Sequence, residues 1–377
     1  MHPADQLRVP LVDIAAQHAE IEHELAPQLQ DILRRAAFIG GKEVELFERQ
    51  FADFLGARHC IGVGNGTDAL ELALRGAGVR PGQEVIVPAN TFIATVEAVV
   101  RMGAVPVLAD VDEEHLLLDP DAVASSVTSR TAAIIPVHLF GQVAPVERLA
   151  EIAVRCGAVI IEDAAQAQGA TRFGRSAGTL GHVAATSFYP GKNLGAAGDA
   201  GAVITDDDGT ARMVRLLSAH GSERKYEHEV MGINSRLDTI QAAVLLTKLK
   251  RLPEWNEHRR QAAALYQALL ADLGAVRTPR SAAGNSDVWH VFVVRLAERD
   301  RVAACLNESG VSTGVHYPAP IHHTEAWRRL GLASGSYPVA EAAARQILSL
   351  PIYPHITVRQ QEHVVASLRA AVDGGQP

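Results

Sequence analysis

A lysine in a loop rich in glycine and proline is the strongest candidate for chemistry in this sequence. Lys192 lies within SFYPGKNLGAAGDAG (187–201), directly after an apolar segment with the character of a strand. Structural lysines usually lie on solvated helix faces, whereas a lysine held among glycines after a strand can point into a cleft. Desolvation in a cleft lowers the pKa of the amine and makes it a nucleophile toward carbonyl carbons.

A carboxylate 29 residues upstream gives this lysine a partner. The segment EDAAQAQGA (162–170) places Asp163 at the end of an apolar strand, where open α/β sheets bind their ligands. An aspartate in this position is also a common helix cap, so Asp163 alone does not indicate a ligand-binding site. Together, an amine that forms a Schiff base and a carboxylate that keeps a pyridine nitrogen protonated are what pyridoxal phosphate requires.

A phosphate-bearing cofactor also needs an anion site, and GVGNGTDAL (62–70) supplies a glycine-rich turn before a helix. Backbone N–H groups at a helix N-terminus favour an anion. Thr67 adds a hydroxyl, and Ser187 could add another.

The same turn leaves an alternative open. Gly64, Gly66 and Ala69 match the pattern of dinucleotide-binding turns, which would indicate an NAD-dependent enzyme. Against that reading, about 60 residues of mostly helical sequence precede the turn, and Glu84 is a poor candidate for the ribose-binding acid.

Alternating apolar and helical segments must position these residues. The apolar runs have no polar alternation, which predicts strands covered on both faces. Their alternation with helices predicts an α/β fold with a mostly parallel central sheet and helices on both faces. The predicted strands are 59–64, 84–88, 105–111, 132–139, 157–164, 184–189 and 200–206.

The flanking segments predict two domains. Helical patterns at 15–38 and 43–55 precede the sheet, and a long helical stretch at 239–274, broken at Pro253, follows it. Beyond it, a strand pattern at 288–297 and helical patterns at 301–310 and 339–346 predict a smaller α+β domain. We expect a large domain over 1–250, with an N-terminal helical segment, and a small domain over 251–377.

Composition and net charge exclude several classes of function. The 377 residues carry a formal net charge of −8, so no basic footprint indicates nucleic acid or an anionic membrane. Three scattered cysteines argue against a disulfide framework and fit a reducing cytoplasm. The N-terminus has no signal-peptide pattern, and no apolar run is long enough to span a membrane.

Four motifs together resemble one enzyme family. PANTFIAT (88–95), EDAAQAQGA, SFYPGKNLGAAGDAG and GINSRLDTIQAA (232–243) occur in the order and at the spacing of the DegT/DnrJ/StrS-type aminotransferases. These are fold-type I pyridoxal-phosphate enzymes of sugar and aminocyclitol biosynthesis. The resemblance extends from about Pro10 to about residue 370.

The resemblance implies roles around the cofactor ring. Lys192 would form the Schiff base with the cofactor and then act as the acid and base of the proton shift. Asp163 would pair with the pyridine nitrogen, and Gln166 would approach the ring hydroxyl. Phe92 would stack on the ring face.

It also implies a phosphate site that two subunits share. Gly66, Thr67 and Ser187 would hold the phosphate of the chain's own cofactor. Asn234 would reach the phosphate of the neighbouring subunit's cofactor, because this family builds its site across a homodimer interface.

Two polar segments are candidates for the substrate side. The loop 220–234 crosses to the other subunit in similar enzymes and contacts the sugar nucleotide there, and the HYP segment within 315–323 lies near the substrate. The substrate-binding candidates are Tyr189, Lys225, Tyr226, His228, His316, Tyr317 and His322. His316, His322 and His323 have no convincing ligand spacing and no accompanying carboxylate cluster, so we expect no metal site.

The resemblance implies transfer of an amino group from an amino acid, L-glutamate, to a nucleotide-linked keto-sugar. The KY-x-H segment followed by GINSRLD is most similar to enzymes that aminate C3 of dTDP-3-keto-6-deoxyhexoses, because C4 and aminocyclitol enzymes more often carry an aromatic residue at the position of Ser235. A C4 keto-sugar or a scyllo-inosose-type aminocyclitol substrate is the alternative. Retention of Lys192 argues against the dehydratase branch, where histidine replaces it, and against a non-catalytic regulatory protein.

Overall fold

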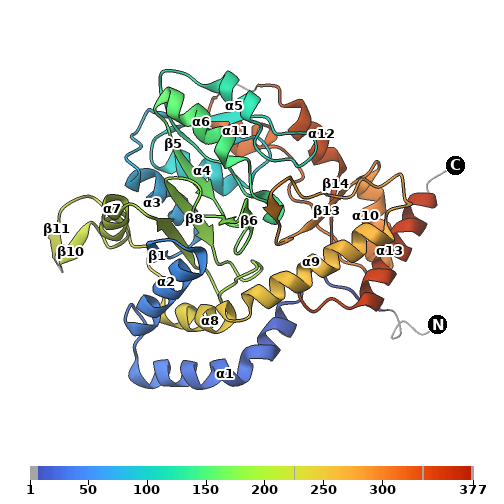
Figure 1. Ribbon diagram of the computed structural model, residues 1–377, viewed down its shortest axis with the longest axis horizontal. Helices are drawn as coiled ribbons and strands as arrows, with labels where there is room; N and C mark the ends of the chain where they lie inside the picture. Colours follow the sequence, from blue (N-terminus) through green and yellow to red (C-terminus); the bar gives the residue numbers. More distant parts are fainter. Residues whose placement is uncertain (1–6, 225, 333–334, 375–377) are drawn as a thin grey trace.

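The computed structural model describes residues 7–224, 226–332 and 335–374, and its larger part is built on a seven-stranded sheet with helices on both faces (Figure 1). The strand order is β1-β9-β8-β5-β4-β2-β3. The bounds are β1 His59–Val63, β2 Glu84–Pro88, β3 Val105–Ala109, β4 Thr131–Ile134, β5 Val159–Asp163, β8 Val183–Ser187 and β9 Gly201–Thr205.

All seven predicted strands form, and all except β2 are somewhat shorter than their apolar runs. Strands β2, β3, β4, β5 and β8 pair in parallel, whereas β9 runs antiparallel between β1 and β8. Every residue of β2 and of β9 is buried, as expected for strands covered on both faces. The parallel order brings the carboxyl ends of β5 and β8 side by side, and these ends carry Asp163 and the loop of Lys192.

Helices pack on this sheet and extend along one edge of it. Several have identifiable caps, such as the Asn65 side chain that accepts a hydrogen bond from the Asp68 N–H at the start of α3. The helices of this part are α1 Ile14–Arg35, α2 Lys42–Leu55, α3 Gly66–Gly76, α4 Ile93–Arg101, α5 Pro120–Ser126, α6 Val146–Cys156, α7 Asp208–Ser218 and α8 Thr239–Leu249, with the 3-10 turn η2 Leu139–Gly141.

A smaller part of the chain follows helix α9 (Leu252–Leu269), which runs from the sheet toward the C-terminal elements (Figure 1). Its own apolar cluster includes Tyr266, Phe292 and Leu368, and also Val9 from the beginning of the chain. Its elements are β13 Phe292–Arg295, α10 Arg299–Glu308, η3 Ile321–His323, α11 Glu325–Arg329, α12 Pro338–Gln346, β14 Ile347–Leu350 and α13 Val358–Asp373. The division into two domains near residue 250 stays a prediction.

Two segments differ from the expectation. Pro253 lies in the first turn of α9, where its missing N–H costs nothing, so it begins a helix after the short break at the end of α8. The predicted strand over 288–297 is limited to β13, because Trp289 has a φ of 46°. The residues before β13 instead bond to η2: the N–H of Val288 donates to Gly141 O, and that of His290 to Phe140 O.

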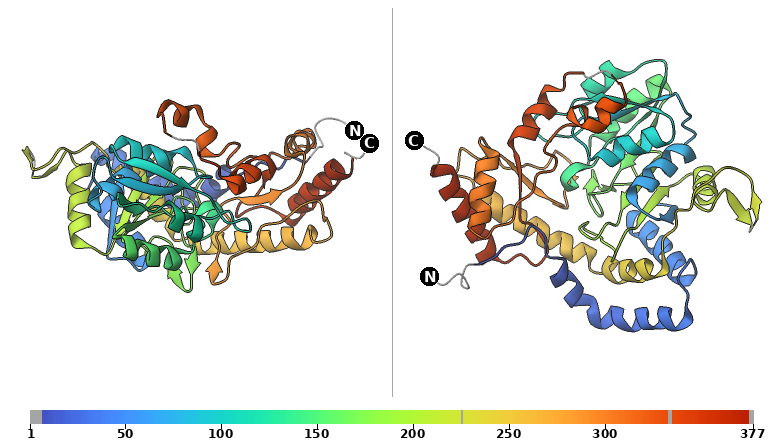
Figure 2. Two further views of the ribbon diagram at one scale, coloured as in Figure 1. Left: turned by 90° about the horizontal axis from the view of Figure 1, so that it is seen from above. Right: turned by 180° about the vertical axis from the view of Figure 1, so that it is seen from behind.

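Short strands complete the structure. The β10–β11 hairpin (Ser222–Arg224 and Glu227–His228) projects from the body of the molecule beyond α7, as the two further views also show (Figure 2). The strands β6 Thr171–Arg172, β7 Arg175–Ser176 and β12 Asn285–Ser286 form a separate small sheet. Among the described helices, none is long and apolar enough to cross a membrane.

Candidate active site

Asp163 is the last residue of β5, and its carboxylate is buried. Its Oδ2 accepts a hydrogen bond from the Thr95 hydroxyl at 2.8 Å, and its Oδ1 accepts one from the Ala165 N–H at 3.2 Å. Asp163 therefore caps no helix, which removes the structural alternative considered from the sequence. Burial raises the pKa of this carboxyl above its ordinary value, although the Thr95 hydroxyl partly opposes that rise.

Lys192 follows β8 in the glycine-rich loop, where its N–H donates to Tyr189 O at 2.8 Å. Desolvation lowers the pKa of its amine to about 8, although the negative charge of Asp163 acts in the opposite direction. The structure thus brings together the amine and the carboxylate that the sequence paired. An amine with this pKa is unprotonated in an appreciable fraction of molecules near neutral pH, which a nucleophile toward carbonyl carbon needs.

The Gln166 amide is held in one orientation beside these two residues. Its Oε1 accepts a hydrogen bond from the Phe140 N–H at 2.7 Å, so its Nε2 faces the Tyr317 hydroxyl, 3.2 Å away. Phe140 has a left-handed backbone, with a φ of 65°, and this conformation directs its N–H at the glutamine. Nothing in the local sequence marks Phe140 for this role, since only the fold brings η2 beside residue 166.

The turn before α3 and the end of β8 form a close-fitting pair. A Cβ added to Gly66 would lie 2.6 Å from the Cβ of Ser187, so only glycine fits there. The Thr67 backbone and the Ser187 hydroxyl consequently lie at one helix N-terminus, which the Asn65 side chain caps. Backbone N–H groups and hydroxyls so arranged suit a phosphate.

The Ser235 side chain holds the turn before α3 in place. Its side chain is 1% exposed, and its hydroxyl donates to Asp68 Oδ2 and accepts from the Gly64 N–H, at 2.8 and 2.9 Å. An aromatic residue at this position would have to displace the turn. In this chain, the Ser235 side chain therefore faces the turn before α3.

Phe92 and Tyr317 lie on the open side of the site. Phe92 begins α4, is 52% exposed, and its ring centroid lies 5.4 Å from that of Tyr317. Tyr189 is also exposed. His316 lies next to Tyr317, and its Nδ1 is 2.8 Å from the Ser349 hydroxyl. These aromatic side chains give the site a wall on which a ring can stack.

Two further substrate candidates lie in the β10–β11 segment that projects from the body of the molecule. Tyr226 and His228 belong to the projecting hairpin, where the His228 Nδ1–H donates to His220 O at 2.9 Å (Figure 2). Lys225 lies outside the described residues. Asn234 is exposed, and its backbone pairs with Ala219 at the end of α7.

A buried hydrogen bond between a histidine and a carboxylate lies beneath the site. Nδ1 of His138 accepts the Ala144 N–H, so the proton is on Nε2, which donates to Glu162 Oε2 at 2.7 Å. Burial alone would raise the pKa of Glu162, but the bonds from His138 and from the Gly178 and Gly181 N–H groups hold it below its ordinary value. The His138 N–H donates to Asp163 O, so this pair anchors the end of β5. No sequence pattern links Glu162 to His138.

His322 is buried, and its Nε2 lies 3.2 Å from Glu341 Oε1 on α12. From the sequence we expected no carboxylate cluster beside the histidines of 315–323, and the structure places one carboxylate, that of Glu341, beside His322. Glu341 is separated from His322 by 18 residues of irregular and helical chain, and no spacing rule links the two.

The structure argues against Glu84 as the ribose-binding acid that the dinucleotide alternative requires. Glu84 is buried at the start of β2, where it pairs with Arg130 and accepts the Thr128 hydroxyl. It stands at the opposite end of the strand from Asp163 and its neighbours, because β2 and β5 run in the same direction.

The comparisons with known proteins agree with this geometry. The DegT/DnrJ/EryC1/StrS aminotransferase family matches residues 19–369. The chain is 46% identical over 362 residues to the Saccharopolyspora erythraea protein named erythromycin biosynthesis sensory transduction protein EryC1, with 96% of this chain and 99% of the relative covered. It is 45% identical over 366 residues to the dTDP-3-amino-3,4,6-trideoxy-α-D-glucose transaminase of Streptomyces venezuelae, with 97% of each covered.

A solved structure has the same fold throughout. The crystal structure of S. venezuelae DesV in complex with a ketimine intermediate matches with a TM-score of 0.93 and 45% identity, over 96% of this chain and 98% of that one. This agreement confirms the predicted fold class and the family that the four motifs indicate. The chain belongs to the DegT/DnrJ/EryC1/StrS aminotransferase family.

Proposed function

We propose that this aminotransferase moves an amino group from L-glutamate to C3 of a dTDP-linked 3-keto-6-deoxyhexose, with pyridoxal phosphate as its cofactor. The observation that carries the proposal is the convergence of a desolvated lysine, a buried aspartate and an oriented glutamine at the ends of β5 and β8. The C3 position is supported by the transaminase of S. venezuelae, whose name specifies a 3-amino sugar.

The residues present fit this cofactor. The absence of a side chain at Gly66 leaves a cradle beside Ser187 that any Cβ would fill, and a phosphate suits it. Asp163 is a buried carboxylate without a cationic hydrogen-bond partner among the described residues, as a protonated pyridine nitrogen requires. Gln166 turns its Nε2 toward the side on which a ring hydroxyl would lie.

The chain's own groups then have distinct tasks. When bound, pyridoxal phosphate supplies an aldehyde and an electron-accepting ring. Lys192 Nζ would hold that aldehyde, and the same amine would take and return the proton that moves during amine transfer. Asp163 would keep the pyridine nitrogen protonated, Phe92 would cover one face of the ring, and Tyr317 would limit the space on the substrate side.

We further propose that two copies share their sites. The hairpin that carries Tyr226 and His228 projects away from its own body, and Tyr226 and Met231 are 81% and 88% exposed. A second copy would cover these side chains and receive Lys225, Tyr226, His228 and Asn234 near its sugar nucleotide and phosphate. We also propose that the enzyme works in the cytoplasm, where its three free thiols stay reduced.

Product analysis tests the reaction. The purified enzyme is given glutamate with the 3-keto or the 4-keto form of a dTDP-6-deoxyhexose, or with scyllo-inosose, and the new C–N bond is located by NMR. We expect turnover of the 3-keto sugar, and loss of both turnover and the visible band of lysine-bound pyridoxal in Lys192→Ala. Turnover of the 4-keto sugar or the cyclitol alone would overturn the C3 assignment, and a colourless protein that binds NAD would overturn the cofactor.

A further inference from the structure

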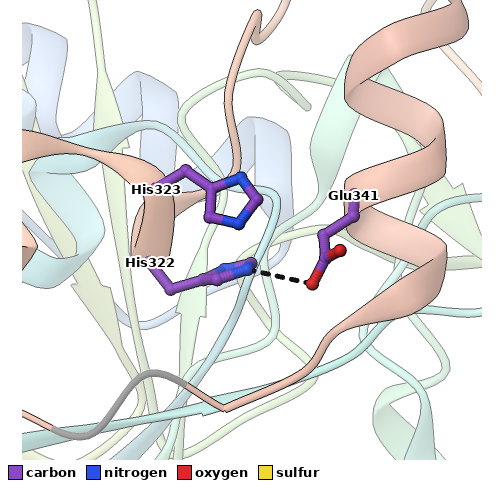
Figure 3. A group of neighbouring side chains, drawn as sticks. All are labelled: His322, His323 and Glu341. Atoms are coloured by element: carbon purple, nitrogen blue, oxygen red, sulfur yellow. Dashed lines mark hydrogen bonds and ion pairs between the residues drawn. The ribbon is translucent and has the colours of Figure 1, made fainter.

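Two histidines and a glutamate from separate elements meet on the C-terminal side of the molecule (Figure 3). His322 and His323 belong to η3, and Glu341 reaches toward them from α12. The possible ligand atoms of the three side chains all lie within 4.8 Å of one another. His322 is buried, Glu341 is half-buried and His323 is exposed, so the group is open to solvent on one side.

The distances approach those of a metal site. Donors that bind Zn²⁺ at about 2.0–2.1 Å in a tetrahedron lie about 3.4 Å from one another. His322 Nε2 and Glu341 Oε1 are already 3.2 Å apart. His323 is exposed, and rotation of its side chain can close the remaining distance without a change in the backbone.

A contact between His322 and Glu341 alone does not explain why His323 also lies beside them. His322 Nδ1 is buried without a hydrogen-bond partner among the described residues, so Nε2, which faces Glu341, is the ring nitrogen available to a cation. The ring of His323 lies 4.1 Å from that of His322, an arrangement that a His322–Glu341 pair does not need. Asp110, which accepts the N–H groups of Val339 and Ala340, adds a second negative charge near His322.

We propose that His322, His323 and Glu341 bind a divalent transition-metal cation of the Zn²⁺ class. Two imidazoles and one carboxylate suit such cations and disfavour Mg²⁺ and Ca²⁺, which prefer oxygen ligands. Three protein ligands leave at least one position for water.

The cation would tie η3 to α12. The segment before η3 carries Tyr317, and the Ile321 N–H donates to Ala89 O at the end of β2. Metal binding therefore stabilises the segment that lies over the site, and we expect a higher unfolding temperature in the presence of the cation.

Competition with a chromophoric zinc indicator tests the site directly on the cofactor-loaded enzyme. We expect one high-affinity Zn²⁺ per chain, and a loss of affinity of at least tenfold in His323→Ala and in Glu341→Gln. His23→Ala is the matched control, because His23 is an exposed histidine 4.0 Å from Glu24 with no second imidazole in the contact. Absence of saturable Zn²⁺ binding, or equal affinity in His323→Ala and His23→Ala, overturns the proposal.

A second measurement guards against unfolding of the variants. Thermal unfolding without metal should be the same for His323→Ala and wild type, since the side chain is exposed, and only wild type should gain stability with Zn²⁺. Co²⁺ should give visible ligand-field bands with wild type and none with His323→Ala. Neither readout uses substrate or turnover, so failure of the metal site and failure of the proposed amine transfer are distinguishable.

Discussion

The hydroxyl of Thr95 should set how strongly this enzyme holds its cofactor. It donates to Asp163 Oδ2 at 2.8 Å in a buried position, and it lies 2.8 Å from the Thr91 hydroxyl. A carboxylate can only accept, so the Thr95 proton points at Asp163 and the Thr91 proton must point at Thr95. Two hydroxyls in series therefore stabilise the ionised form of Asp163.

Thr95→Val removes this donor and keeps the shape of the side chain. A hydrogen bond to a charged group contributes about 1.5–3 kcal/mol, and one pKa unit corresponds to about 1.4 kcal/mol. The pKa of Asp163, already raised by burial, should rise further by roughly one to two units. Because only the ionised carboxylate can pair with a protonated pyridine nitrogen, affinity for pyridoxal phosphate should fall by about 10- to 100-fold at a pH below the pKa of Asp163.

Absorbance titration of the cofactor-free enzyme with pyridoxal phosphate, repeated over a range of pH, measures both effects. Cofactor binding is lost as pH falls through the pKa of Asp163, so in Thr95→Val this loss should begin at a pH roughly one to two units higher. Thr247→Val is the matched control, because Thr247 is equally buried but its hydroxyl donates to Ala243 O within α8. The reasoning is refuted if Thr95→Val and Thr247→Val give the same affinity and the same pH profile.

Three further predictions concern the groups around this centre. The amine of Lys192 has a pKa of about 8 in the folded cofactor-free protein and 10.5 in an unfolded chain, so the unfolded state binds more protons between these two pH values. The free energy of unfolding should therefore increase as the pH rises from about 8 to 10.5. Lys192→Met should remove this increase in denaturant titrations. Gly66→Ala should abolish cofactor binding because its Cβ meets that of Ser187 at 2.6 Å, and the added change Ser187→Gly should restore the unfolding temperature but not full phosphate affinity. Glu162→Gln should cost about 2–6 kcal/mol of stability in chemical denaturation, because an amide NH2 would replace an oxygen that accepts two of the four N–H donors, and each unsatisfied buried donor costs about 1–3 kcal/mol. A loss below about 1 kcal/mol would contradict the proposed anchoring by His138.

The sequence alone determined the sheet and the central pair of residues. Uninterrupted apolar runs can satisfy their backbone only as strands covered on both faces, and the parallel order then places the ends of two strands together. Asp163 and the loop of Lys192 are both defined by such strand ends, so their meeting follows from local pattern and topology. The four motifs then identified the family, because their order and spacing are seldom met by chance.

Only the tertiary structure decided which groups support that pair. Thr95, Phe140 and His138 bond to Asp163, Gln166 and Glu162 from α4, η2 and the segment before η2, and none has a sequence pattern that distinguishes it from ordinary core residues. Ser235 acts on the phosphate turn across 171 residues of chain. Side-chain hydrogen bonds depend on positions that packing sets to within tenths of an ångström, and sequence spacing does not carry that information.

His322 and His323 also show that sequence spacing does not reveal which charged groups meet in the fold. Sequence spacing argued against a metal site at His322 and His323, since the histidines lacked convincing ligand spacing and no carboxylate cluster accompanied them. Glu341 completes the group because α12 packs back toward η3, with its N-terminal N–H groups bonded to Asp110. The sequence therefore determined the scaffold and the lysine–aspartate centre, whereas long-range packing decided the partners of each charged group, because burial and hydrogen bonding are properties of the folded chain.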